Sequence, residues 1–186
     1  MYIGFMNTGC GPPCNRIRCD VARRKLPFVA TKKGFSVNLG PDERALLRLL
    51  MGEVGELLTT TAIGDPKMAR LFPPAYSSDG SSNNDEAESE YQRLMRDELV
   101  ASRLHSIATV DQFLADEQLK TLTFAQLDAF SASLNSVRLV LGTLIDVGES
   151  DDELDPDDER HQELNLYNFL SWLLDNAIAA LSQSKF

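Results

Sequence analysis

The chain has 186 residues, of which 43% are hydrophobic and 25% are charged, and this composition suits one globular domain with a sizeable core. Its net charge of −10 is unevenly distributed: residues 1–33 hold seven basic and one acidic residue, whereas residues 34–186 hold eleven basic and twenty-seven acidic residues. The imbalance, +6 against −16, predicts a basic tail with an anionic partner and excludes the acidic body as a nucleic-acid binder on its own.

The sequence carries no recognisable signal for export or for membrane insertion. Its first residues lack a cationic region, and glycines interrupt any apolar stretch there. No segment approaches the roughly 18 uninterrupted apolar residues of a membrane span. Three cysteines are too few for a secreted disulfide scaffold. We therefore expect a cytoplasmic protein without a membrane partner.

Residues 1–33 have the features of a poorly ordered tail, because glycines and prolines punctuate them and no periodic pattern survives. Cys10 and Cys14 flank a Gly-Pro-Pro sequence, and Cys19 follows closely. A disulfide requires Cα atoms within about 7 Å, whereas a polyproline-II path would separate Cys10 from Cys14 by roughly 12 Å. Closing this pair requires a turn at Gly11 or a cis peptide before a proline. Pairing of Cys14 with Cys19 is the competing arrangement.

Several interpretations of these cysteines stay open. The neighbouring Arg16 and Arg18 favour the reactive thiolate, so a redox switch is one interpretation and a passive, exposed tail is the other. A thioredoxin-like site is less well supported, because the spacing has one residue too many and no strand–helix context surrounds it. A zinc site lacks its usual fourth ligand, since His105 and His161 are distant in sequence. We expect neither a metal nor another cofactor.

The basic residues of the tail form a candidate contact with phosphate groups of nucleic acid. They are Arg16, Arg18, Arg23, Arg24, Lys25, Lys32 and Lys33. Such an arm supplies salt-sensitive affinity for DNA but little sequence discrimination. An arm that folds back onto the acidic body is an equally good interpretation.

After the tail, the pattern predicts a short strand and then a helix. Residues 35–39 alternate apolar and polar side chains, as a half-buried strand does. Pro41 suits the first position of a helix, and Asp42 and Glu43 complement its positive end. We expect this helix to end near Thr59. Its predicted apolar stripe is Leu46, Leu47, Leu50, Val54, Leu57 and Leu58.

The middle of the chain predicts a short helical turn over residues 65–71 and a flexible loop over residues 77–84. A long helix should follow over residues 85–114. Its inner face is expected to contain Tyr91, Leu94, Leu99 (or Met95), Leu104, Ile107 and Phe113.

Two further helices are predicted in the C-terminal third. Thr123 and Gln126 match a capping box, and a regular stripe follows: Leu127, Phe130, Leu134, Val137, Leu141 and Leu144. The acidic residues 149–159 should lead into the last helix, with Asp155 as its cap and Pro156 at its first position. The buried stripe of this helix is predicted as Leu164, Tyr167, Leu170, Leu174, Ala177 (or Ile178) and Leu181.

The predicted fold is mainly α: a compact helical bundle of about four main helices with a short N-terminal strand, behind the basic tail. The domain boundary is predicted between residues 1–33 and 34–186. The chain has no Gly-rich phosphate loop and no nucleophile elbow, and residues 149–159 lack the glycine and glutamate positions of an EF-hand. We therefore expect a protein that is not an enzyme.

Five short sequence motifs occur in the helical part of the chain. They are ERALLRLL (43–50), Asp65-Pro66, RLFP (70–73), RLVLGT (138–143) and YNFLSWL (167–173). In this order they resemble an actinobacterial domain-of-unknown-function family that includes the oxidative-stress transcriptional regulator AosR. The similarity runs from about residue 35 to residue 181.

This resemblance implies a redox-responsive regulator of transcription that senses oxidant through a Cys-x3-Cys disulfide. Cys10 and Cys14 have this spacing. DNA, the transcription machinery (RNA polymerase or a sigma factor), or both would then be partners. The alternative is a redox-indifferent helical adaptor or scaffold that binds another protein.

Overall fold

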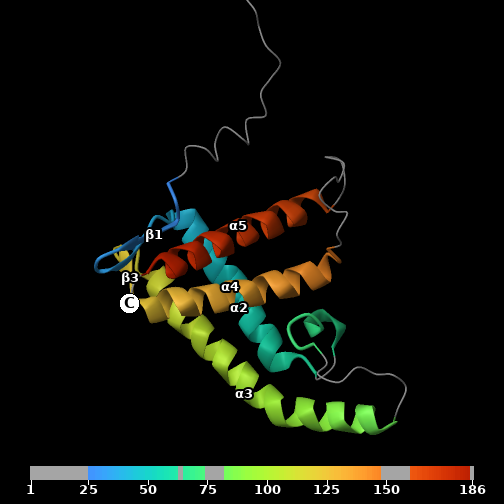
Figure 1. Cartoon of the computed structure of the whole chain (residues 1–186). Helices are drawn as coiled ribbons and strands as arrows, with labels where there is room; N and C mark the ends of the chain where they lie inside the picture. Colours follow the sequence, from blue (N-terminus) through green and yellow to red (C-terminus); the bar gives the residue numbers. More distant parts are fainter. Residues whose placement is uncertain (1–24, 63–64, 74–81, 148–159, 185–186) are drawn as a thin grey trace, which may run out of the picture.

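The computed structural model of the protein describes residues 25–62, 65–73, 82–147 and 160–184 (Figure 1). The elements in chain order are β1 (Phe28–Thr31), β2 (Gly34–Val37), α2 (Pro41–Thr60), η1 (Pro66–Met68), α3 (Ser82–Ala115), β3 (Thr121–Leu122), α4 (Phe124–Leu144) and α5 (His161–Gln183). In the described ranges, four long helices thus pack together with a small sheet at one end (Figure 1). The predicted, mainly α fold with a short N-terminal strand is confirmed, and the structure shows this strand as part of a three-stranded sheet.

Helix α4 is the centre of the fold, since it contacts α2, α3, α5, η1 and β2. It runs away from the sheet, and α5 returns beside it to reach β1 (Figure 1). The side chains of its inner face have almost no exposed surface, including Leu127, Phe130 and Leu134. This burial contributes to the hydrophobic driving force that joins the layers.

The three strands form an antiparallel sheet in the order β1-β2-β3. Phe28 of β1 lies opposite Val37 of β2, and Phe35 lies opposite Leu122 of β3. Gly34 begins β2 with a φ of +129°, and a Cβ atom there would collide with the carbonyl oxygen of Leu122. Only glycine permits this close approach between the hairpin and β3.

Strand β1 lies inside the range 1–33 that was predicted to be tail. Phe28 is only 3% exposed and packs against Phe130 with ring centroids 5.0 Å apart. Pro27 is also fully buried. Residues 27 and 28 therefore belong to the folded body, although they precede residue 34. The sequence did not predict β1 because four residues are too few to show an alternating pattern, and packing against the core stabilises the strand instead.

Helix α2 agrees closely with its prediction. Pro41 occupies its first turn, and the Gly40 N–H donates to Glu43 Oε2 at 2.8 Å. The helix ends at Thr60, one residue from the predicted end. Its inward face includes Leu47, Met51, Val54 and Leu58, together with the buried Arg44.

Helix α3 is longer than predicted and presents a different face to the core. It begins at Ser82, within the predicted loop, while residues 77–81 lie outside the described residues. Leu94 is 59% exposed, so its predicted burial is wrong. Of the alternatives Leu99 and Met95, Leu99 is exposed and Met95 is half-buried. Arg96, which is only 6% exposed, faces inward instead. The short turn predicted at residues 65–71 is confirmed by η1, which packs against α4.

Helix α4 begins with the predicted capping box: the Gln126 N–H donates to Thr123 Oγ1 at 3.2 Å, and the Thr123 N–H donates to Gln126 Oε1 at 2.9 Å. The predicted stripe is buried at Leu127, Phe130, Leu134 and Val137, and Leu141 is half-buried. Leu144 is a correction, because it lies exposed at the last position of the helix, beyond the reach of the core.

Helix α5 is described from His161 to Gln183, and its predicted first residue, Pro156, lies outside the described residues. The acidic residues 149–159, with the predicted cap Asp155, lie outside the described residues. Within the helix, Ala177 is buried and Ile178 is exposed, so the first of the two predicted alternatives is correct. In the part of the chain that the structure describes, none of the helices has the length and apolar character needed to cross a membrane.

Candidate functional site

The predicted redox and phosphate-contact residues lie mostly outside the described residues. This applies to Cys10, Cys14 and Cys19, and to Arg16, Arg18, Arg23 and Arg24. The remaining three predicted contacts are described and exposed: Lys25 precedes β1, and Lys32 and Lys33 form the turn of the β1–β2 hairpin. The structure thus brings these last two lysines onto the rim of the sheet.

A groove opens where the chain enters the folded body. It has a volume of about 590 Å³ and is lined by Lys25, by Asp42 and Glu43 at the start of α2, and by Trp172 of α5. Asp42 is exposed, whereas Glu43 is engaged in the helix cap. Acidic and aromatic groups therefore border the point from which the basic residues 1–24 extend.

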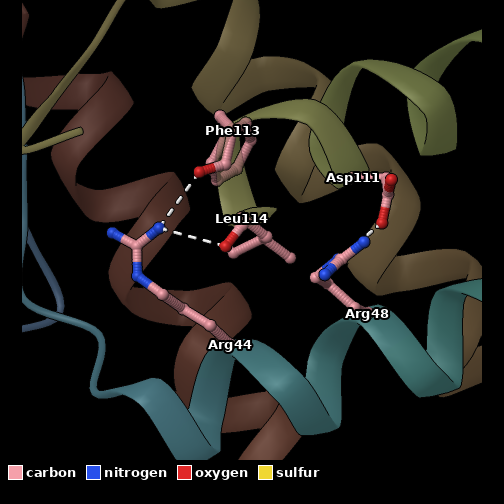
Figure 2. A network of polar contacts seen from close by, with 5 residues as sticks. All are labelled: Arg44, Arg48, Asp111, Phe113 and Leu114. Carbon is pink, nitrogen blue, oxygen red and sulfur yellow. Dashed lines mark hydrogen bonds and ion pairs between the residues drawn. The ribbon is translucent and has the colours of Figure 1, made fainter. Parts of the chain in front are cut away.

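Arg44 is a buried cation that holds the end of α3 in place (Figure 2). Its Nη1 donates to the carbonyl oxygens of Phe113 at 3.0 Å and Asp116 at 3.2 Å, and its Nη2 donates to the carbonyl of Leu119 at 3.2 Å. A cation at a helix C-terminus also interacts favourably with the helix dipole. The contacts of Arg44 are with backbone carbonyls, and this defines a structural role.

Arg48 lies one turn further along α2 and has a different environment (Figure 2). Its Nε donates to Asp111 Oδ1 of α3 at 2.7 Å, and both side chains are about half exposed. The hydrogen bond and the charge of Asp111 raise the pKa of Arg48. This pair links α2 to α3 at the surface.

Two arginines of α3 enclose an aromatic ring next to η1. Arg96 and Arg103 place their guanidinium carbons 5.0 and 5.5 Å from the ring centre of Phe72. Arg96 also donates to the carbonyl of Thr61 at 2.9 Å, and Arg103 donates to the hydroxyl of Ser136 at 2.9 Å. Burial lowers the pKa of Arg103. These two cations therefore join the segment before α3 to both α3 and α4.

A second pair of arginines lies where η1, α4 and α5 meet. Arg138 lies 5.0 Å from the ring centre of Tyr167, and its Nε donates to Ser171 Oγ at 2.7 Å. Arg70 donates to the carbonyl of Val147 at 2.9 Å. Gly142 separates Arg70 from Tyr167, since a Cβ atom at this glycine would lie 3.0 Å from each of them.

These contacts bring together sequence strings that are far apart in the chain: residues 70–73, 138–143 and 167–173. We call Arg70, Arg96, Arg103 and Arg138 the arginine cluster. In the described ranges, no carboxylate forms an ion pair with any of the four. Sequence reasoning had treated these residues only as parts of strings or helices. The spacing of Arg96 and Arg103, seven residues apart on one helix face, was the signal that could have found part of the cluster.

The described residues contain no group of three or more His, Cys, Asp or Glu side chains arranged to hold a metal ion. His105 is exposed and His161 is half-buried at the start of α5. Two small cavities, of about 200 and 180 Å³, instead flank Arg103. The groups that line them can bind polar or anionic molecules rather than a soft metal.

The fold and its polar clusters define a small α-helical domain with an N-terminal antiparallel sheet, preceded by a basic, cysteine-containing segment. Residues 24–181 match the family described as a domain of unknown function, DUF2017. Because the match covers most of the chain, the protein belongs to this family. The matched segment begins at residue 24, just before the first described residue, and therefore includes β1. Neither the curated proteins nor the solved structures include a match.

Proposed function

We propose that this protein is a redox-responsive regulator of transcription in the oxidative-stress response, related in this role to AosR. Its sensor would be Cys10 and Cys14, acting in the cytoplasm where thiols start reduced. The observation that supports the proposal is the position of all three cysteines in the basic segment directly before Lys25 and β1. The proposal assigns no enzymatic activity to the protein.

The proposed chemistry uses a peroxide as oxidant. A thiolate of the pair attacks a peroxide oxygen, which yields a sulfenic acid and releases water or an alcohol after protonation. The second thiolate then attacks the sulfenic sulfur and expels hydroxide, which takes a proton from solvent to become water, and a disulfide is left. Arg16 and Arg18 favour the thiolate form through their positive charge. Two thiols are oxidised, and one peroxide bond is reduced.

A disulfide in this segment would change the path of the basic arm. Because Pro27 and Phe28 are anchored in the core, the arm is fixed at one end and its conformation determines where its charges point. The acidic body opposes close approach to DNA, so contact with DNA would be made through the arm and through Lys32 and Lys33. RNA polymerase or a sigma factor is the alternative partner, reached through protein contacts.

The test compares DNA binding by reduced and peroxide-treated protein in gel shifts across a salt series. Each neutralised phosphate should add about 0.9 to the slope of log affinity against log salt. We expect binding to change on oxidation in the wild type and in Cys19→Ser, and to become insensitive to oxidant in Cys10→Ser and Cys14→Ser. Peptide mapping of the oxidised wild type should show a Cys10–Cys14 bond.

Three outcomes decide between the interpretations. A Cys14–Cys19 bond would contradict the sensor pair. Absence of DNA binding in both redox states, together with redox-dependent capture of RNA polymerase, would replace DNA by a protein partner. Absence of any redox-dependent partner would favour the redox-indifferent adaptor and contradict the proposal.

A further inference from the structure

A small polar cavity lies between α3 and α4, away from the basic arm. Its volume is about 200 Å³, which corresponds to roughly six water molecules at about 30 Å³ each. Ser102 and Ser106 line it from α3, and Ser133 and Ser136 line it from α4, with Arg103 as its charged residue. Four hydroxyl groups and one guanidinium group in so small a space are an unusual lining for the interface of two packed helices.

Two buried polar atoms of this lining have no hydrogen-bond partner among the described residues: Arg103 Nε and Ser133 Oγ. Ser133 is only 2% exposed, so bulk water does not compensate for the missing partner. Buried polar groups in folded proteins almost always have a partner, and an exception commonly marks a site for a water, an ion or a ligand. Both atoms belong to residues that line the same cavity.

The charge of the cavity is positive and uncompensated within the described part of the chain. Arg103 donates to Ser136 Oγ at 2.9 Å and to the carbonyl of Leu71 at 3.3 Å, which are neutral partners. The cavity lining contains no carboxylate. Burial lowers the pKa of Arg103, but an arginine remains protonated at neutral pH. A bound anion would supply the missing counter-charge.

We propose that this cavity binds a tetrahedral oxyanion: inorganic phosphate or the phosphate group of a monoester. Arg103 supplies the positive charge and N–H donors, and Ser102 of α3 and Ser133 of α4 supply hydroxyl donors from both helices. The hydroxyls of Ser106 and Ser136 donate to the carbonyls of Ser102 and Ala132 in their own helices. A tetrahedral anion has oxygens in several directions, so it can accept from α3 and α4 together, whereas a planar carboxylate has only two oxygens in one plane. A desolvated guanidinium is well suited to this role because it is weakly hydrated and forms several directed hydrogen bonds.

The test titrates the full chain with sodium phosphate at constant ionic strength and follows the melting temperature and the ³¹P line width. The wild type should show a saturable response, which sodium chloride at equal ionic strength does not produce. Phosphoserine serves as the monoester probe: a stronger response than to phosphate identifies an ester ligand, and a weaker one identifies free phosphate. Either result supports the oxyanion site.

Variants distinguish this site from general attraction between phosphate and a basic protein. Arg103→Gln should abolish the response. Arg138→Gln is the matched control, because Arg138 also contacts a serine and an aromatic ring but does not line the cavity. It should retain the response.

Ser133→Ala gives a second measurement that does not depend on the folding of the arginine variant. It should lower the affinity for phosphate by about tenfold, because a hydrogen bond to a charged group is lost. It should also raise the melting temperature of the free protein, since the unpaired buried hydroxyl is removed. A phosphate response that is unsaturable, or unchanged in Arg103→Gln and Ser133→Ala, would overturn the proposal.

Discussion

Arg44 and Arg48 lie one turn apart on α2, yet their guanidinium groups have different surroundings (Figure 2). Arg44 is 4% exposed and donates to backbone carbonyls at the end of α3 and in the loop that follows. Arg48 forms an exposed pair with Asp111. The carbonyls around Arg44 have lost their water, so the loss of their donor leaves them unpaired.

We predict that Arg44→Met lowers the free energy of unfolding by about 3 kcal/mol, because several buried hydrogen bonds to a charged donor disappear together. Arg48→Met is the control, and it should have a far smaller effect because water and salt screen an exposed pair. Urea unfolding followed by circular dichroism measures both. Similar losses in the two variants would show that Arg44 is not the anchor of this loop.

Apart from the seven-residue spacing of Arg96 and Arg103, the sequence contains no signal for the arginine cluster. Arginine is usually a surface residue, and nothing in the string around Arg96 or Arg103 indicates that its stem is buried against Phe72. Their partners come from segments about 32 to 35 positions away in the chain. Contacts of this kind depend on tertiary packing, which a local pattern does not contain.

At the scale of the elements, two glycines in helices test how tightly the helices pack. Gly52 of α2 has nothing within 4 Å of the position that a Cβ atom would occupy. Gly142 of α4 would place that atom 3.0 Å from both Arg70 Nη1 and Tyr167 Cε2. The first glycine is exposed, and the second is buried where α4 meets η1 and α5.

We predict that Gly52→Ala raises the free energy of unfolding by about 0.5–1 kcal/mol, because alanine loses less backbone entropy in a helix. Gly142→Ala should instead lower it by about 1 kcal/mol, since the added methyl forces Tyr167 and Arg70 apart and overpacks the contact. Thermal and urea unfolding of the two variants give the signs directly. A gain in both would mean that the contact at Gly142 relaxes without cost.

The helices differ in how well their patterns could be predicted. Helix α4 contacts elements on several sides. Its apolar stripe therefore predicted the helix, and its capping box predicted where the helix begins. Helix α3 packs against the segments on either side of η1 through the side chains of Arg96 and Arg103, which cover the ring of Phe72 while their charges remain hydrogen-bonded. Leu94 was therefore assigned to the wrong face. The search for apolar periodicity fails where a long charged side chain takes the inward position.

At the scale of the whole molecule, the position of the domain boundary is testable by truncation. A chain that starts at Lys25 retains β1 and should melt cooperatively at a temperature close to that of the full chain. A chain that starts at Gly34 loses Phe28, whose burial and contact with Phe130 contribute about 3 kcal/mol or more. It should melt at a much lower temperature or fail to unfold cooperatively, as followed by circular dichroism.

If the two truncated chains have the same melting temperature, the domain boundary predicted at residue 34 is correct. The sequence placed residues 28–31 in the tail because β1 is four residues long and lies within a basic stretch. Composition assigned the stretch to the tail, whereas a few apolar residues in it join the core. The mainly α architecture was predictable, because each of its helices carries a local period. The three-stranded sheet was only partly predictable, because β3 has two residues.

The partners of Arg44 have a consequence for synthesis on the ribosome. The carbonyls that accept its hydrogen bonds in the α3–β3 region lie 69 to 75 positions later in the chain. At about 5–20 residues per second, translation takes roughly 4 to 15 seconds to cover this distance. During that interval the nascent α2 presents an uncovered apolar face and a guanidinium group that only water can solvate. The N-terminal half of this domain therefore cannot complete its fold early, and its final packing waits for the segment that follows α3.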